Sequence, residues 1–223
     1  MRVLRAGPTS YGLWAALVQA LALAALLACF SAGVASARAL KLVVLGDSLT
    51  AGLGVPPGKA FPDQLQAALR AKGLDVSVVN AGVSGDTAED GLTRYGWSVP
   101  PETDALIVEL GANDMLRGFP PDMTKKTLAA ILDKAKAAKT PILLAGMKAA
   151  PNLGPEYGRA FESIYPELAK SYGAILYPFF LEGVAGDPKL DQPDGLHPTT
   201  AGVGVIVQRI LPSVEELLGR VSH

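Results

Sequence analysis

Five short apolar runs that lack a consistently polar face constrain the fold of this chain more than any other feature. They lie at 40–45, 76–79, 105–110, 142–145 and 174–177. Runs of this length bounded by glycine, proline or polar residues are typical of strands. A strand without a polar face has to be covered on both sides, which parallel sheets between two layers of helices provide.

Segments with helical spacing alternate with these runs. We expect helices at 61–72, 86 to about 95, 123–138, 155–172 and 199–218. The first of them shows apolar residues at Leu65, Ala68 and Leu69 and ends before Gly73, as amphipathic helices do. Five strands interleaved with helices predict a three-layer α/β/α fold with a five-stranded parallel sheet. The Pro/Gly clusters at 54–58 and 96–101 are loop-sized, so we predict a single domain over residues 40–220.

The N-terminal 37 residues have the pattern of a secretory signal peptide. Arg2 and Arg5 precede an apolar run at 13–30, and small residues follow at 35–37. This pattern predicts export to the periplasm or beyond, with cleavage after Ala37. Two alternatives remain open: an uncleaved membrane anchor, because about 18 apolar residues are long enough to span a bilayer, and a lipid anchor on Cys29.

Charge and residue counts exclude several classes of partner. The net charge is −1 with Lys and Arg scattered along the chain, so we expect no nucleic acid partner. Cleavage after Ala37 removes Cys29, the single cysteine, and with it disulfides and thiolate ligands. His197 is the one internal histidine, and the carboxylates show no cation-loop spacing, so we expect neither metal nor cofactor. The oligomeric state is not indicated.

Polar or small residues that suit catalysis follow three of the predicted strands, and a fourth group opens the last predicted helix. In open parallel sheets, ligands bind beyond the carboxyl ends of the strands. Ser48 follows the first strand, Gly82 the second and Asn113 the third, while Asp194 and His197 lie three residues apart before the last helix.

Each of these residues has an ordinary structural interpretation when it is taken alone. Ser48 is a candidate helix cap, Asn113 a turn former, and Asp194 a cap against which His197 packs. Asp86 is also interpreted as a helix cap. The occurrence of all four groups in this order favours a catalytic site instead, because the probability that four independent motifs occur together by chance is low.

The histidine and its carboxylate partner carry most of this argument. The second histidine, His223, is the last residue, so histidine-based catalysis requires His197. A carboxylate three residues before it has the spacing needed to orient a catalytic base. Asp187 and Asp191 compete with Asp194 for that role.

These motifs resemble the four sequence blocks of the SGNH (GDSL-type) hydrolases, in the same order. The matching stretches are Gly46-Asp47-Ser48-Leu49, Gly82, Gly111-x-Asn113-Asp114 and Asp194-x-x-His197-Pro198. Residues 79–87, 108–119 and 164–170 further resemble the bacterial periplasmic branch of multifunctional acyl-CoA thioesterases, arylesterases and lysophospholipases. The similarity extends from residue 41 to the end of the chain. It implies a flavodoxin-like strand order with the active site between the first and third strands. Ala112 departs from the pattern, where related sequences carry a second glycine.

The expected activity is hydrolysis of carboxylic esters or thioesters. Ser48 would be the nucleophile, His197 its base and Asp194 the group that orients His197. The N–H groups of Ser48 and Gly82 and the Asn113 amide would form the oxyanion hole.

The acyl pocket and the reaction class leave several possibilities open. Leu116, Phe119 and residues 147–157 are candidate walls of an acyl pocket, or ordinary loop packing. Two other functions are possible: a carbohydrate O-acetyl esterase using the same groups, and a non-catalytic flavodoxin-like module that binds phosphate after the first strand.

Overall fold

The computed structural model describes residues 14, 19 and 38–221. The predicted signal at 1–37, including Cys29 and the cleavage site at Ala37, falls almost entirely outside the described residues, as does His223. The residues from Ala39 onward form one compact unit. In the described part of the chain, no helix combines the length and the apolar character that crossing a membrane requires.

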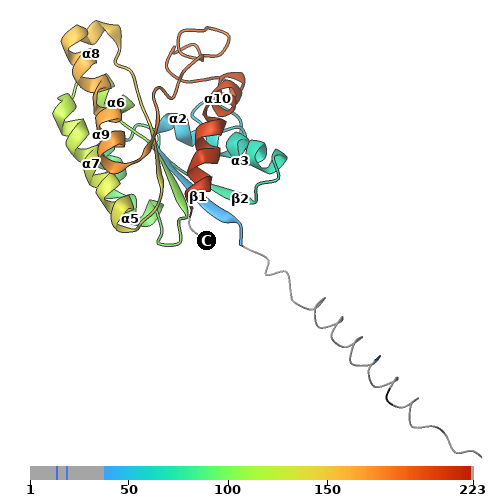
Figure 1. Cartoon of the computed structure of the whole chain (residues 1–223). Coiled ribbons are helices and arrows are strands. Elements are labelled where there is room, and N and C mark those ends of the chain that lie inside the picture. The colour runs from blue at the N-terminus through green and yellow to red at the C-terminus, as the bar shows by residue number, and fades with distance from the viewer. Residues whose placement is uncertain (1–13, 15–18, 20–37, 222–223) are drawn as a thin grey trace, which may run out of the picture. The chain divides into compact units, whose positions relative to one another are not determined.

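Five parallel strands form the centre of this unit (Figure 1). They are β1 (Leu40–Gly46), β2 (Val76–Gly82), β3 (Ala105–Glu109), β4 (Ile142–Ala145) and β5 (Ile175–Tyr177), in the order β2-β1-β3-β4-β5. Every residue of β3 and β4 is buried, as expected for strands covered on both faces. The predicted parallel α/β fold with a flavodoxin-like strand order is confirmed.

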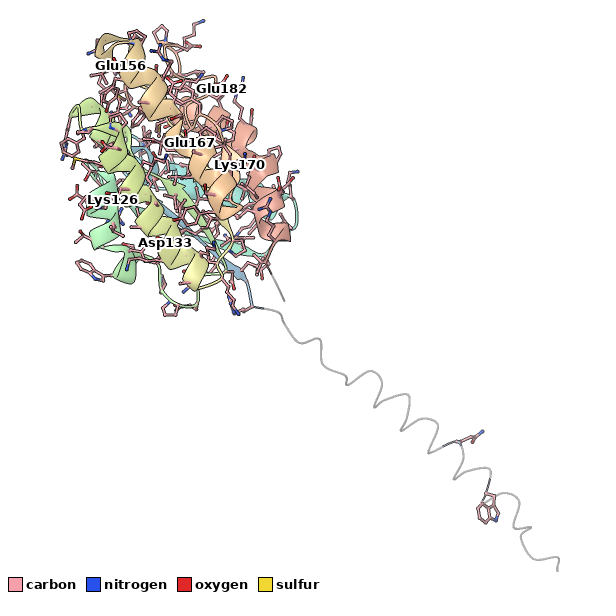
Figure 2. All side chains as sticks on the ribbon, turned by 60° about the vertical axis from the view of Figure 1, so that its left-hand side comes forward. Lys126, Asp133, Glu156, Glu167, Lys170 and Glu182 are labelled. Carbon is pink, nitrogen blue, oxygen red and sulfur yellow. The ribbon has the colours of Figure 1, made fainter. Side chains whose placement is uncertain are left out.

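Helices cover both faces of the sheet (Figure 1). One layer contains α3 (Phe61–Ala71) and α10 (Thr200–Gly219), which pack against each other. The other contains α4 (Ala88–Thr93), α5 (Tyr95–Ser98), α7 (Pro121–Ala137), α8 (Pro155–Glu162) and α9 (Ile164–Tyr172). Figure 2 looks onto this second layer and shows Lys126, Asp133, Glu167 and Lys170 on its outer surface.

Two predicted helices differ from the structure for local reasons. The helix expected at 155–172 is broken between α8 and α9. Pro166 lacks the N–H that would bond to Glu162, so the helix hydrogen-bond ladder cannot continue there. The helix expected at 86–95 is divided at Arg94 into α4 and α5. It begins later than expected, because Thr87 and Asp90 form a reciprocal capping box.

The prediction that Asp86 caps a helix was therefore wrong. Thr87 is the N-cap of α4, and the Asp86 carboxylate forms an ion pair with Arg94 at 2.6 Å. The Arg94 guanidinium also donates to the Gly46 carbonyl at 2.9 Å. Arg94 thus links Asp86, just before α4, to the end of β1.

The loops that follow β2 and β3 also differ from expectation. β2 continues three residues beyond the predicted end and stops at Gly82. Residues expected to form a turn after β3 instead form a short helix, α6 (Ala112–Leu116), with Gly111 as its N-cap at φ 112°. A positive φ of this kind is strained for residues with a side chain, so glycine allows the sharp change from strand to helix.

Candidate active site

The nucleophile candidate lies in a tight turn at the carboxyl end of β1. Asp47 caps the short helix α2 (Ser48–Ala51) by accepting a hydrogen bond from the Leu49 N–H at 3.0 Å. The Ser48 hydroxyl is therefore not needed as a cap. Within residues 38–221, the Ser48 N–H has no hydrogen-bond acceptor, so it is available to a ligand.

Ser48, His197 and Asp194 form a continuous chain of hydrogen bonds. The Ser48 Oγ lies 2.8 Å from His197 Nε2, and His197 Nδ1 lies 2.7 Å from Asp194 Oδ2. Asp194 Oδ1 accepts the N–H groups of Leu196 and His197 at 2.9 and 3.1 Å. The Leu196 bond first, then the His197 side chain, lower the pKa of Asp194 to about 2. The ionised carboxylate holds the proton of His197 on Nδ1, which leaves the Nε2 lone pair facing the Ser48 hydroxyl.

Of the predicted oxyanion donors, Asn113 in α6 lines the same cavity as Ser48, whereas Gly82 at the end of β2 is not among the residues that line it. The Gly82 N–H donates to Asn80 Oδ1 at 3.0 Å. The Asn113 amide donates to Asp47 Oδ2 at 3.1 Å and to the Asp86 carbonyl at 2.9 Å. A substrate oxygen bound at these donors therefore takes the place of one of their protein acceptors.

A cavity of about 490 Å³ opens beside Ser48 and His197. Its apolar wall is formed by Met115, Leu116, Met147, Ala149, Ala150, Phe179 and Leu181. Among the walls expected from sequence, Leu116 and residues 147–151 line the cavity, whereas Phe119 and residues 152–157 do not. The Phe119 carbonyl instead accepts a hydrogen bond from Tyr157. Phe179 and Leu181 were missed, because nothing local shows that the loop after β5 folds back to this site.

The model of the GDSL-like Lipase/Acylhydrolase family matches residues 44–205, most of the chain. The chain belongs to the GDSL (SGNH) hydrolase family. The family and the hydrolase class expected from sequence are confirmed.

Similar GDSL hydrolases match over most of their own length. Esterase TesA of Pseudomonas aeruginosa is 40% identical over 183 residues, 82% of this chain and 91% of that protein. Thioesterase 1/protease 1/lysophospholipase L1 of Escherichia coli is 43% identical over 164 residues, 73% of this chain and 77% of that protein. The crystal structure of AlinE4, an SGNH-hydrolase family esterase, superposes with a TM-score of 0.69 at 44% identity, over 82% of this chain and 98% of AlinE4.

Among the three candidate aspartates, the structure of this GDSL hydrolase brings Asp194 to the histidine. Asp191 accepts the Gly186 N–H at 2.7 Å and Asp187 accepts the Lys189 N–H at 2.9 Å, so both carboxylates are used within their own loop. In the described residues, no group of three or more His, Cys, Asp or Glu side chains is arranged to hold a metal ion.

Two buried carboxyl groups, one in the nucleophile turn and one beneath it, were not assigned a role from the sequence. Asp47 is 1% exposed, and its burial raises its pKa from 3.8 to about 6, although the Leu49 N–H bond and nearby His197 oppose this. Glu109, at the end of β3, is fully buried, and burial first and Asp47 second raise its pKa well above the usual range. A charged residue inside the apolar run 105–110 was the signal that could have identified Glu109.

Proposed function

We propose that this protein is a serine hydrolase that cleaves carboxylic esters and thioesters through an acyl-enzyme on Ser48. The observation that most directly supports this proposal is the chain of hydrogen bonds from Ser48 through His197 to Asp194, beside an apolar cavity. The relatives named esterase, thioesterase and lysophospholipase support the same reaction class.

The reaction proceeds in two matched halves. His197 Nε2 accepts the Ser48 proton while Oγ attacks the carbonyl carbon, and the resulting imidazolium then protonates the departing alkoxide or thiolate. A water molecule next loses its proton to His197 and attacks the acyl-enzyme, which releases the carboxylic acid and restores Ser48. Asp194 keeps the imidazole in the required tautomer and stabilises its charged form.

Negative charge on the carbonyl oxygen is stabilised by donors that are in place before the reaction. We assign this role to the N–H groups of Ser48 and Gly82 and to the Asn113 amide. Removing one such donor typically costs about 2.7 to 4 kcal/mol of transition-state stabilisation.

The character of the cavity favours a substrate with an aliphatic acyl chain. Most of the residues that line the cavity are apolar, with Lys148 and Asp191 as polar exceptions outside the catalytic groups, whereas a carbohydrate would need several hydrogen-bonding partners for its hydroxyl groups. A catalytic base opposite Ser48 has no purpose in a phosphate-binding module. We therefore place ester and thioester hydrolysis ahead of both alternatives.

We also propose that residues 1–37 are a cleaved export signal and that residues 40–220 are one catalytic domain. The basic start, apolar run and small residues at the expected cleavage site support export. N-terminal sequencing of the protein recovered from the periplasmic fraction tests this proposal, and an intact N-terminus there would contradict it.

The activity is tested with purified wild-type protein and the Ser48→Ala variant on matched substrates. These are 4-nitrophenyl esters from acetyl to palmitoyl, the corresponding acyl-CoA thioesters and a lysophospholipid. Ser48→Ala is expected to lower kcat by more than ~10³-fold, because the nucleophile is lost. Ser171→Ala, on the exposed surface of α9, is the control that keeps full activity.

The outcome separates the alternatives. Turnover of Ser48→Ala near the wild-type rate would overturn the proposed mechanism. A strong preference for acetyl over longer acyl groups would instead indicate an O-acetyl esterase.

A further inference from the structure

Glu109 is a buried acidic residue that the proposed reaction does not use. It ends an otherwise apolar strand and has no solvent exposure. Burying a carboxyl group is costly unless hydrogen bonds compensate for the lost water. Its partners therefore indicate what it does.

Both hydrogen bonds of Glu109 go to the nucleophile turn. Its Oε2 accepts the Thr50 hydroxyl at 2.7 Å and the Asp47 N–H at 3.3 Å. These two donors lie on either side of Ser48 in the sequence. Its other oxygen, Oε1, has no hydrogen-bond partner among the described residues, so the carboxyl group is directed at this turn alone.

The end of β1 is shaped to admit this carboxyl group. Gly46 is in register with Glu109 in the sheet. A Cβ atom at position 46 would lie 2.6 Å from Glu109 Oε2 and 2.1 Å from Thr50 Oγ1. Any side chain at this position would therefore push the carboxyl group away from the turn.

Glu109 is also linked to the oxyanion amide. It lies four residues before Asn113, at the end of the strand that leads to α6. The Asn113 amide in turn donates to Asp47 Oδ2. Glu109, Asp47 and Asn113 thus close a ring that joins the nucleophile turn to the oxyanion donor.

The ionisable groups around Glu109 are mostly acidic. Asp47 is the nearest ionisable neighbour, and buried Tyr165 also faces it from α9. Asp47 in turn interacts with two charged groups, His197 and Asp86. The Asp86 carboxylate is paired with Arg94. Burial first and Asp47 second raise the pKa of Glu109 well above its usual range, because a charged carboxylate loses its water there and lies beside a second acidic group.

We propose that Glu109 is a positioning residue of the active site: its buried carboxyl group holds the turn on both sides of Ser48 against β3 and so sets the distance between the nucleophile and the Asn113 amide. This inference rests on the proposed function. It differs from a purely structural role, because it requires that the folded enzyme lose turnover when the carboxyl group is removed.

The test compares kcat, KM and melting temperature of four variants on 4-nitrophenyl butyrate. Glu109→Leu keeps a buried side chain without the acceptor, and we expect kcat to fall about 10- to 100-fold while KM changes less than about twofold. Glu109→Gln keeps a hydrogen-bond acceptor of similar size, and we expect kcat within about threefold of wild type. Thr50→Val removes one hydrogen bond and lowers kcat by about threefold to tenfold.

Thr103→Val is the matched control for Thr50→Val. Its buried hydroxyl donates to the Pro100 carbonyl at the amino end of β3, away from the active site. It should lower the melting temperature and leave kcat unchanged.

Several results would overturn the inference. One is a folded Glu109→Leu protein with wild-type kcat and a lower melting temperature. Another is a Glu109→Gln protein that loses as much kcat as Glu109→Leu. If Glu109→Leu does not fold, Thr50→Val decides: unchanged kcat overturns the inference and a decrease absent from Thr103→Val supports it. Failure of the proposed function is distinct, because it would appear as an active Ser48→Ala variant.

Discussion

Gly82→Ala separates two reasons for a glycine at the end of β2. If Gly82 acted as an N–H donor alone, alanine would serve equally, since it retains the N–H. The structure gives a second reason: a Cβ atom at position 82 would lie 2.3 Å from the Ala51 nitrogen and 2.8 Å from both the Asp47 oxygen and the Thr50 carbonyl carbon. All three are backbone atoms of the nucleophile turn.

The size of the effect follows from these distances. Ordinary contacts begin at 3.4 Å, so the turn that carries Ser48 must move by about 1 Å. A displacement of about 1 Å in an active site costs roughly 10²-fold in rate, or about 2.7 kcal/mol of transition-state stabilisation. Overpacking of this kind also lowers the free energy of unfolding by about 1 to 3 kcal/mol.

The measurements are kcat/KM on an aryl ester and urea unfolding of the purified variant. Gly96→Ala is the control: no atom lies within 4 Å of its Cβ position and its φ is not positive. That variant should keep wild-type activity and be at least as stable as wild type, because alanine favours the helix at an exposed position. Wild-type kcat/KM and unfolding free energy in Gly82→Ala would refute the argument, because they would show that the turn tolerates the added methyl group.

Two further predictions concern the carboxylates. Asp194→Asn should lower kcat by about 10²- to 10³-fold in steady-state assays. This is less than the ~10⁴-fold typical of buried triad aspartates, because the Asp194 side chain is 44% exposed and water screens its charge. An unchanged kcat would contradict its role. For Asp47, a folded-state pKa of about 6 instead of 3.8 means that its contribution to stability is complete below about pH 4 and is lost as pH rises through 6. Relative to Asp47→Asn, wild type should therefore lose up to about 3 kcal/mol of unfolding free energy between about pH 4 and 7, and a difference independent of pH in urea unfolding would rule this out.

Much of the architecture could be predicted from local pattern. Apolar runs without a polar face indicated all five strands, because a strand covered on both faces selects apolar residues along its whole length. Element ends were less accurate. The capping box at Thr87 moved the start of one helix, and the missing N–H of Pro166 divided another, and periodicity does not register such individual hydrogen bonds.

The sequence by itself determined the fold class, the family and the residues from which the candidate site is built, because each depends on short stretches of adjacent residues. Tertiary structure alone decided their partners. Ser48 meets a histidine 149 residues away, a contact that exists only because the strand order brings the end of β1 beside the last loop. The same packing placed Glu109 beneath the turn. Burial and charge at these positions depend on the neighbours that packing supplies, and a linear pattern does not contain them.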